Sequence, residues 1–189
     1  MKVVLDTNSL LALVRYYLPF DDDKVLINFF KNQIEIGNIL IIDKVISECE
    51  YISKGIILSQ LSFLNDKAFL KSSKTPIKTD SLIAPNTKQF FHQLNFVFVN
   101  NPIKRKLNEI EFENQMNLFI ESADLKQIIL CLNLIKDGEF AVLVTEETES
   151  SNDNKLFKKI PAICKELKIP TMTLPELLNN FDGINIYFK

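Results

Sequence analysis

Four short, almost purely apolar runs alternate along the chain with longer segments in which apolar residues recur every three to four positions. The runs are KVVLD (2–6), NILII (38–42), EFAVLVT (139–145) and TMTL (171–174). Short runs rich in β-branched residues are typical of buried parallel strands. A further strand-like run, INIYF (184–188), lies near the end of the chain.

The intervening segments carry the start and stop signals of helices. The first begins at Thr7 or Asn8, both natural N-cap residues, and stops before Pro19. Others open with acidic residues or end on glycine, as helices commonly do. Helices are therefore expected over residues 7–17, 21–37, 43–54, 55–70, 86–98, 108–120, 121–138 and 158–168.

Strands that alternate with helices predict an α/β protein with a mainly parallel sheet. We expect a three-layer α/β/α architecture with a central sheet of four to five strands, built as a single domain over residues 1–189. The most loop-like stretch is KSSKTPIKTDSLIAPNTK (71–88). Residues 70–116 are too short to hold much core of their own, which favours a helical insertion within the domain.

The composition excludes several kinds of site. The formal net charge of −2 gives no global attraction toward nucleic acid or an anionic membrane. The three cysteines are widely spaced and form no CxxC pair, and a single histidine makes His-based metal sites and Ser-His triads hard to support. No run approaches the roughly 20 apolar residues of a spanning helix, and no secretory signal is present. We therefore expect a soluble, cytoplasmic protein with no membrane partner.

Acidic residues fall where the strands of such a sheet end. Asp6 ends the first run, Glu48 lies in the helix after the second, and Asp124 lies near the start of the helix before the third. Glu146 and Glu147 follow the third run directly. Ligands of open parallel sheets bind beyond the carboxyl ends of the strands. The topology therefore predicts that carboxylates from distant parts of the chain meet at one sheet edge.

Such a cluster needs a counter-charge, and a divalent cation is the natural one. Mg²⁺ and Mn²⁺ take oxygen ligands and often share their shell with a phosphate. The lack of histidines and paired thiols at these positions argues against zinc. An all-carboxylate magnesium site in an α/β protein points to phosphodiester or phosphoryl chemistry.

Each acid also has a simpler interpretation. Asp6 suits a helix N-cap, Glu48 a solvated helix face on which Glu50 is its neighbour, and Asp124 a favourable charge near a helix N-terminus. The acids after the third run suit a polar loop. Alternative metal ligands remain open at Glu146, Glu121 and Asp153, and the run of aspartates at 21–23 is expected only to start a helix.

The motifs resemble those of the PIN-domain nucleases, and within that family the VapC-type toxins. The resemblance rests on VVLDTN (3–8), VISE (45–48), AD (123–124) in a long apolar helix, and LVTEE (143–147), in the family's order. The ending IPAICKELKIP (160–170) followed by TLPELL is similar to a less-studied branch of PIN-like proteins. Together these motifs span nearly the whole chain.

The resemblance implies the roles of individual residues. Asp6, Glu48, Asp124 and Glu147 would hold one or two Mg²⁺ or Mn²⁺ ions, Thr145 would join their hydrogen-bond network, and Asn8 would help to orient Asp6. The family more often has Asp at the fourth position, so the choice between Glu146 and Glu147 stays open. The mechanism implied is hydrolysis of RNA by a metal-activated water attacking phosphorus in line, leaving a 5′-phosphate and a 3′-hydroxyl.

The resemblance also implies partners. We expect an endoribonuclease that is the toxin of a type II toxin–antitoxin pair, blocked by a cognate antitoxin and commonly homodimeric. Candidate RNA phosphate contacts are Lys104, Arg105, Lys106, Lys158 and Lys159.

Two other classes of function are considered. The first is a catalytically inactive PIN-like module for binding or assembly, against which the intact acidic quartet argues. The second is a haloacid-dehalogenase-like hydrolase, which would need an aspartate two residues after Asp6, where Asn8 stands.

Overall fold

A four-stranded, wholly parallel sheet forms the centre of the structure, a computed structural model that describes residues 1–149 and 155–181. The strands are β1 (Lys2–Leu5), β2 (Ile39–Leu40), β3 (Ala141–Val144) and β4 (Thr171–Met172). Their order is β2-β1-β3-β4, with Val3 paired to Ile39 on one side and to Val142 on the other. The expected parallel sheet is confirmed. The strand expected over 184–188 lies outside the described residues.

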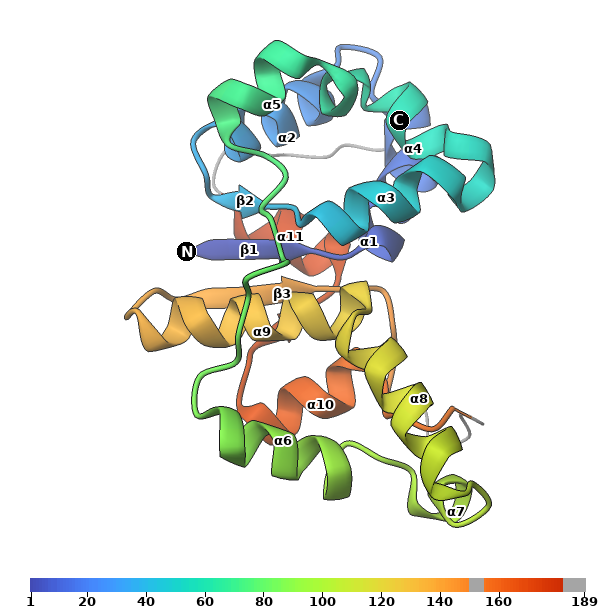
Figure 1. Ribbon diagram of the computed structural model, residues 1–189. Helices are drawn as coiled ribbons and strands as arrows, with labels where there is room; N and C mark the ends of the chain where they lie inside the picture. Colours follow the sequence, from blue (N-terminus) through green and yellow to red (C-terminus); the bar gives the residue numbers. More distant parts are fainter. Residues whose placement is uncertain (150–154, 182–189) are drawn as a thin grey trace.

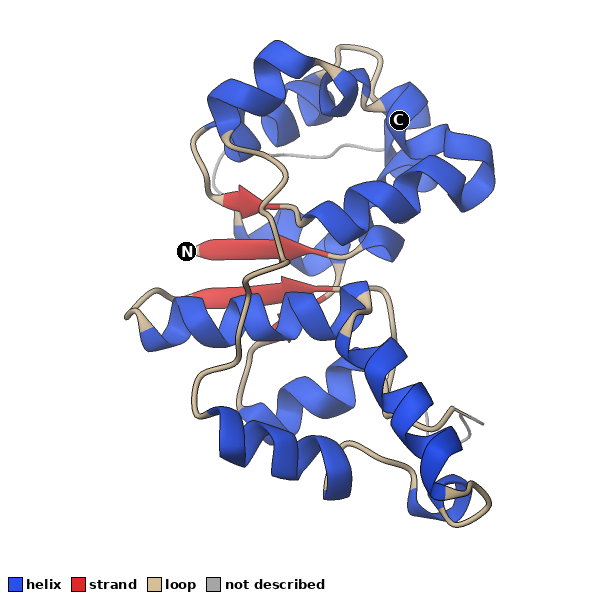
Figure 2. Ribbon diagram, in the orientation of Figure 1, coloured by secondary structure: helices blue, strands red, loops and turns tan. Residues whose placement is uncertain are grey.

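Helices cover both faces of this sheet. In Figure 1, α9 (Ala123–Lys136) runs along β3 on the near side, while α11 (Leu174–Asn180) lies behind β1. Figure 2 shows the strands enclosed between helices on the two sides, which confirms the three-layer α/β/α architecture. The remaining α-helices are α1 (Thr7–Ala12), α2 (Val25–Glu35), α3 (Asp43–Tyr51), α4 (Ile56–Gln60), α5 (Lys67–Ser73), α6 (Thr87–Phe96), α7 (Asn101–Lys104), α8 (Glu109–Ile120) and α10 (Ile160–Leu167).

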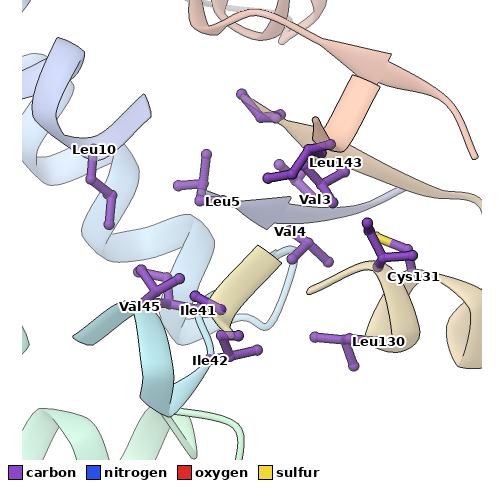
Figure 3. Close-up of a cluster of buried hydrophobic side chains, with 14 of the residues drawn as sticks. Val3, Val4, Leu5, Leu10, Ile41, Ile42, Val45, Leu130, Cys131 and Leu143 are labelled. Carbon is purple, nitrogen blue, oxygen red and sulfur yellow. The ribbon is translucent and has the colours of Figure 1, made fainter. Parts of the chain in front are cut away.

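The core lies between β1 and the helices that cover it. Val3, Val4 and Leu5 are at most 1% exposed. Figure 3 shows Leu130 and Cys131 of α9 approaching the β1 side chains from one side. Burying one large aliphatic side chain contributes about 1.5–3 kcal/mol. The strand is therefore fixed on both faces, and this fixes the position of the residue that follows it, Asp6.

The helix expected over residues 55–70 is divided. It ends as α4 at Gln60, passes through a 3₁₀ turn at Ser62–Asn65, and restarts as α5. The cause is Asp66, whose side chain accepts hydrogen bonds from the backbone N–H groups of Ala68 and Phe69 and so caps a new helix.

The first helix also departs from the expected form. After Ala12 it continues as one π-helical turn, Leu13–Tyr17, in which the N–H of Leu18 donates to the carbonyl of Leu13. The wider turn changes the direction of the side chains that follow Leu13. Single π turns of this kind are frequent at functional sites.

The segment after α5 crosses from one half of the molecule to the other (Figure 1). Ile77 exchanges backbone hydrogen bonds with Ile41 and Asp43, and the Thr79 hydroxyl donates to the Asp43 carboxylate at 2.7 Å. Beyond the crossing, Phe90, Phe98 and other apolar residues of the 70–116 region belong to the same core cluster as the sheet. This region therefore shares a hydrophobic core with the sheet. Within the described residues, no helix is long and apolar enough to cross a membrane.

Candidate active site

Asp6 stands at the carboxyl end of β1, in the middle of the sheet. It is 3% exposed. Its Oδ1 accepts hydrogen bonds from the backbone N–H of Thr7 at 2.7 Å and from Nε2 of Gln127 at 3.4 Å, and its Oδ2 accepts from the Thr145 hydroxyl at 3.0 Å. Strand β1 and helix α9, which are far apart in the sequence, therefore both position this carboxylate.

The negative charge of Asp6 is stabilised by hydrogen bonds from uncharged groups. Burial raises the pKa of this carboxyl, and the hydrogen bonds from Thr145, Gln127 and the backbone of Thr7 and Asn8 oppose that effect. In the described part of the chain, no lysine or arginine forms an ion pair with Asp6. A buried carboxylate in this situation favours either a proton or a cation that enters from solution.

Asp124 supplies the clearest electrostatic sign of a carboxylate cluster. It lies in the first turn of α9, a helix capped by the Ser122 side chain. Burial, together with the charges of Asp6, Glu147 and Glu48, raises the pKa of Asp124 to about 7, while Lys155 opposes them. The four acids expected from the sequence therefore lie close enough to repel one another.

Glu48 forms the solvent-exposed side of this cluster. Its Oε2 accepts a short hydrogen bond from the hydroxyl of Thr7, the residue directly after Asp6. Burial and the charge of Asp6 raise the pKa of Glu48, and the hydrogen bond from Thr7 opposes them. Helix α3 thus presents Glu48 to the end of β1, whereas the charge of Glu50, which is exposed on the same helix, is not among those that raise the pKa of Asp124.

Glu147 and Glu146 point to different surroundings. Glu147 raises the pKa of Asp124, and its Oε2 accepts from the backbone N–H of Ile160 at 3.2 Å. Oε1 of Glu146 instead accepts from the N–H of Leu174 at 2.7 Å, at the start of α11. Of the two adjacent glutamates, Glu147 is the one that joins the cluster.

The other residues that the sequence suggested as metal ligands or supporting groups do not share one location. Glu121 pairs with Lys126 at 3.0 Å and Lys44 at 3.4 Å, and its side chain is 59% exposed. Its charge is not among those that raise the pKa of Asp124. Asn8 acts on Asp6 through its backbone, and the residue lines a neighbouring pocket. Asp153 lies outside the described residues.

The donor set fits a hard divalent cation in its chemistry. All four side chains offer carboxylate oxygens, and Asp6 and Asp124 have no strong cationic partner in the described structure. Mg²⁺ and Mn²⁺ prefer such ligands. Among the described residues, however, no three histidine, cysteine or acidic side chains already stand in an arrangement that could hold an ion. Holding an ion would therefore need the carboxylates to draw together.

Gln127 was not expected from the sequence. It is fully buried, three residues after Asp124 on α9, and it donates to Asp6 while its own Oε1 has no hydrogen-bond partner in the described structure. The signal was available in ADLKQIIL, where a glutamine interrupts an apolar helix face one turn after an acid. A buried amide there needs a polar partner, and Asp6 provides it.

A pocket of about 490 Å³ opens beside the cluster. Its lining includes Asp124 and Glu147 together with Lys155, Lys158 and Lys159. The apolar residues of the lining include Leu107, Leu118 and Phe119. The lining of this pocket therefore contains both cationic and acidic side chains.

The basic residues at 104–106 divide into two kinds. Lys104 is engaged within the protein, since its Nζ donates to the Asn95 carbonyl at 2.7 Å and lies 4.1 Å from the ring centroid of Phe112. Arg105 and Lys106 are exposed. Only the latter two have side chains directed at solvent.

The chain matches the family described as "Domain of unknown function (DUF4411)" over residues 3–183, and it belongs to that family. Comparison with curated proteins and with solved structures finds no match.

Proposed function

We propose that the protein is a Mg²⁺- or Mn²⁺-dependent endoribonuclease whose site consists of Asp6, Glu48, Asp124 and Glu147. The observation that carries the proposal is the rise of the Asp124 pKa to about 7, caused by burial and by the charges of the other three acids. Four carboxylates that destabilise one another at the carboxyl end of a parallel sheet are an expensive arrangement unless they bind a cation. Strongly perturbed pKa values of this kind cluster at functional sites.

Each residue has a definite task in this proposal. Asp6 is the central ligand, fixed by Thr145 and Gln127. Asp124, Glu48 and Glu147 complete the oxygen donors, and the Thr7 hydroxyl holds Glu48 in place. When bound, one or two Mg²⁺ or Mn²⁺ ions supply an activated water and neutralise charge on the phosphate. The described site therefore needs no nucleophilic side chain.

The pocket next to the site suits the path of an RNA strand. Lys158 and Lys159 would contact phosphates, and Lys155 lies beside them. Arg105 and Lys106 would extend this surface, whereas Lys104 supports the fold. By its likeness to VapC-type toxins, we further propose that the protein is a homodimeric toxin and that a cognate antitoxin covers the acidic site.

One observation favours a second candidate, a PIN-like module that binds partners without catalysis. No three acidic side chains of the described structure are already arranged to hold an ion. A direct metal titration separates the two candidates. Isothermal calorimetry with Mn²⁺ should show binding to the wild type that is lost in Asp6→Asn and retained in Glu50→Gln, the exposed neighbour on α3. Binding equal in all three proteins, or absent from all, would favour the non-catalytic module.

A further inference from the structure

A second pocket, of about 480 Å³, shares Glu147 with the lysine-lined pocket. Its size is within the range of about 300–1,000 Å³ found for small-molecule sites. We call it the tyrosine pocket, and the residues that matter here are Asn8, Arg15, Tyr16, Tyr17, Glu146 and Glu147. Because Glu147 lines both this pocket and the lysine-lined one, both adjoin the acidic cluster.

The orientation of Glu146 is the central observation. Its Oε1 is held by the backbone N–H of Leu174 at 2.7 Å, and its Oε2 has no hydrogen-bond partner among the described residues. The residue also lines the tyrosine pocket. A carboxylate that is fixed through one oxygen presents the other as a directed acceptor. The ligand that fits must offer N–H or O–H donors there.

The aromatic residues of the pocket provide a stacking surface. Tyr16 is 64% exposed, and Tyr17, the next residue of the π turn, is half-buried. Single-stranded RNA bases are commonly recognised by stacking on aromatic side chains and by hydrogen bonds to their Watson–Crick edges. Rings beside a fixed carboxylate therefore suit a nucleobase.

Arg15 argues against a cationic ligand. Its guanidinium donates to the Ser53 hydroxyl and lies in an exposed position at the same pocket. It would repel a lysine or arginine from a partner protein and attract a phosphate. A nucleotide satisfies both Arg15 and Glu146, whereas a basic side chain satisfies only Glu146.

The chemistry of the bases selects one of them. Guanine alone carries two adjacent donors, N1–H and the N2 amino group, on its Watson–Crick edge. In cytosine and adenine the amino group stands beside an acceptor nitrogen, and in uracil the N3–H lies between two carbonyl oxygens. Each carboxylate oxygen has two lone-pair sites, so the free Oε2 can accept from both of these donors, and an acceptor-only carboxylate therefore favours guanine.

We propose that the tyrosine pocket binds the guanine base of a nucleotide next to the cleaved phosphate, with Glu146 as the residue that determines specificity. The placement next to a cleaved phosphate rests on the proposed nuclease function, whereas base binding itself does not. The pocket then makes the enzyme selective for a guanine-containing site in single-stranded RNA.

The test measures nucleotide binding without metal and without catalysis. The chain has four tyrosines and no tryptophan, so 3-fluorotyrosine gives a simple ¹⁹F NMR spectrum in which Tyr16→Phe assigns one signal. Titration with 5′-GMP should shift the Tyr16 signal and give a dissociation constant about 5- to 100-fold lower than those for AMP, CMP and UMP, as expected for one good pair of hydrogen bonds to a base edge.

Glu146→Gln is the decisive variant. Its carbonyl oxygen still accepts from Leu174, so the start of α11 is preserved, but it presents an amide donor to the pocket. In Glu146→Gln the preference for GMP should disappear. Tyr16→Phe should keep the preference, and Tyr16→Ala should weaken the binding of all four nucleotides. Thermal unfolding followed by circular dichroism verifies that each variant is folded.

Three results would overturn the proposal. They are equal binding of the four nucleotides, a GMP preference that survives in Glu146→Gln, and tighter binding of L-argininamide than of GMP, which would indicate a partner protein's cationic side chain. Selective GMP binding without RNA cleavage would instead leave the pocket standing and remove the nuclease proposal.

Discussion

The hydroxyl of Thr145, at the end of β3, donates a hydrogen bond of 3.0 Å to Oδ2 of Asp6, at the end of β1, across 139 positions of the chain. The same Thr145 oxygen accepts from the backbone N–H of Glu147 at 3.2 Å. One side chain therefore links two of the four acids of the proposed site and fixes the loop that follows β3.

Replacing Thr145 with valine should test this link. Valine keeps the shape of the side chain but leaves a buried carboxylate with one donor fewer, a loss of about 1–3 kcal/mol. The pKa of Asp6, already raised by burial, should rise further because a hydrogen bond that favours the charged form is removed. Urea unfolding at pH 7 measures the loss. Thr145→Ser is the matched control and should stay close to the wild type; equal stability of all three proteins would contradict the role assigned to this hydroxyl.

The raised pKa of Asp124 predicts how stability depends on pH without metal. In the unfolded chain an aspartate loses its proton near pH 4, whereas in the folded protein Asp124 keeps it until about pH 7. The folded state then binds more protons than the unfolded state in this range, so stability falls as pH rises from about 4 to 7.

Asp124→Asn removes that titration. In EDTA its melting temperature should decline less between pH 4.5 and 7.5 than that of the wild type, and at pH 7.5 it should be higher by several degrees, the shift expected for about 1 kcal/mol. Differential scanning calorimetry across this range provides the measurement. Parallel curves for the two proteins would show that Asp124 does not carry the expected repulsion.

Two glutamates that follow β3, Glu147 and Glu149, should differ in metal binding. Glu147→Gln is expected to weaken Mn²⁺ binding by at least about tenfold, in line with the loss caused by disturbing a metal site. Glu149→Gln should have no such effect, because that residue is paired with Lys165 at the surface. Electron paramagnetic resonance of free Mn²⁺ reports both affinities. An equal loss in the two variants would argue against Glu147 as a ligand.

The lysine-lined pocket predicts where RNA binds. Lys158→Gln should weaken binding of a single-stranded RNA and make it less dependent on salt, because one phosphate contact is lost. Lys136→Gln, at the exposed far end of α9, keeps the same change of charge away from the site and should bind as the wild type does. Fluorescence anisotropy in EDTA over a range of salt concentrations distinguishes these results. Matching salt slopes in the two variants would place the RNA elsewhere.

The fold could be predicted from the sequence because the strands are continuous buried runs. VVL at 3–5 and AVLV at 141–144 are apolar on both faces, as only central parallel strands are, and helices separate them. The breaks within helices were harder to predict from the sequence. Asp66 starts a new helix inside an apolar pattern, and nothing in the residues 13–17 distinguishes a π turn from an α-helix.

The candidate site could be predicted from the sequence only in part. The convergence of Asp6, Glu48, Asp124 and Glu147 was expected from the position of each acid relative to the carboxyl ends of the strands, and in the structure the charges of the other three raise the pKa of Asp124. The distinct surroundings of Glu146 and Glu147 could not be read from the sequence, because they depend on where Leu174 and Ile160 lie in space. Gln127 was missed because its partner is 121 residues away.

The most direct test of the proposed function is cleavage of a mixed RNA pool by the purified protein with Mn²⁺ or Mg²⁺, compared with Asp6→Asn and with EDTA. The proposal predicts fragments with 5′-phosphate ends from the wild type, and none from the variant or in EDTA. Metal-independent cleavage, or equal cleavage by Asp6→Asn, would contradict it. A wild type that neither cleaves RNA nor binds either metal would show that the acidic cluster serves a different purpose.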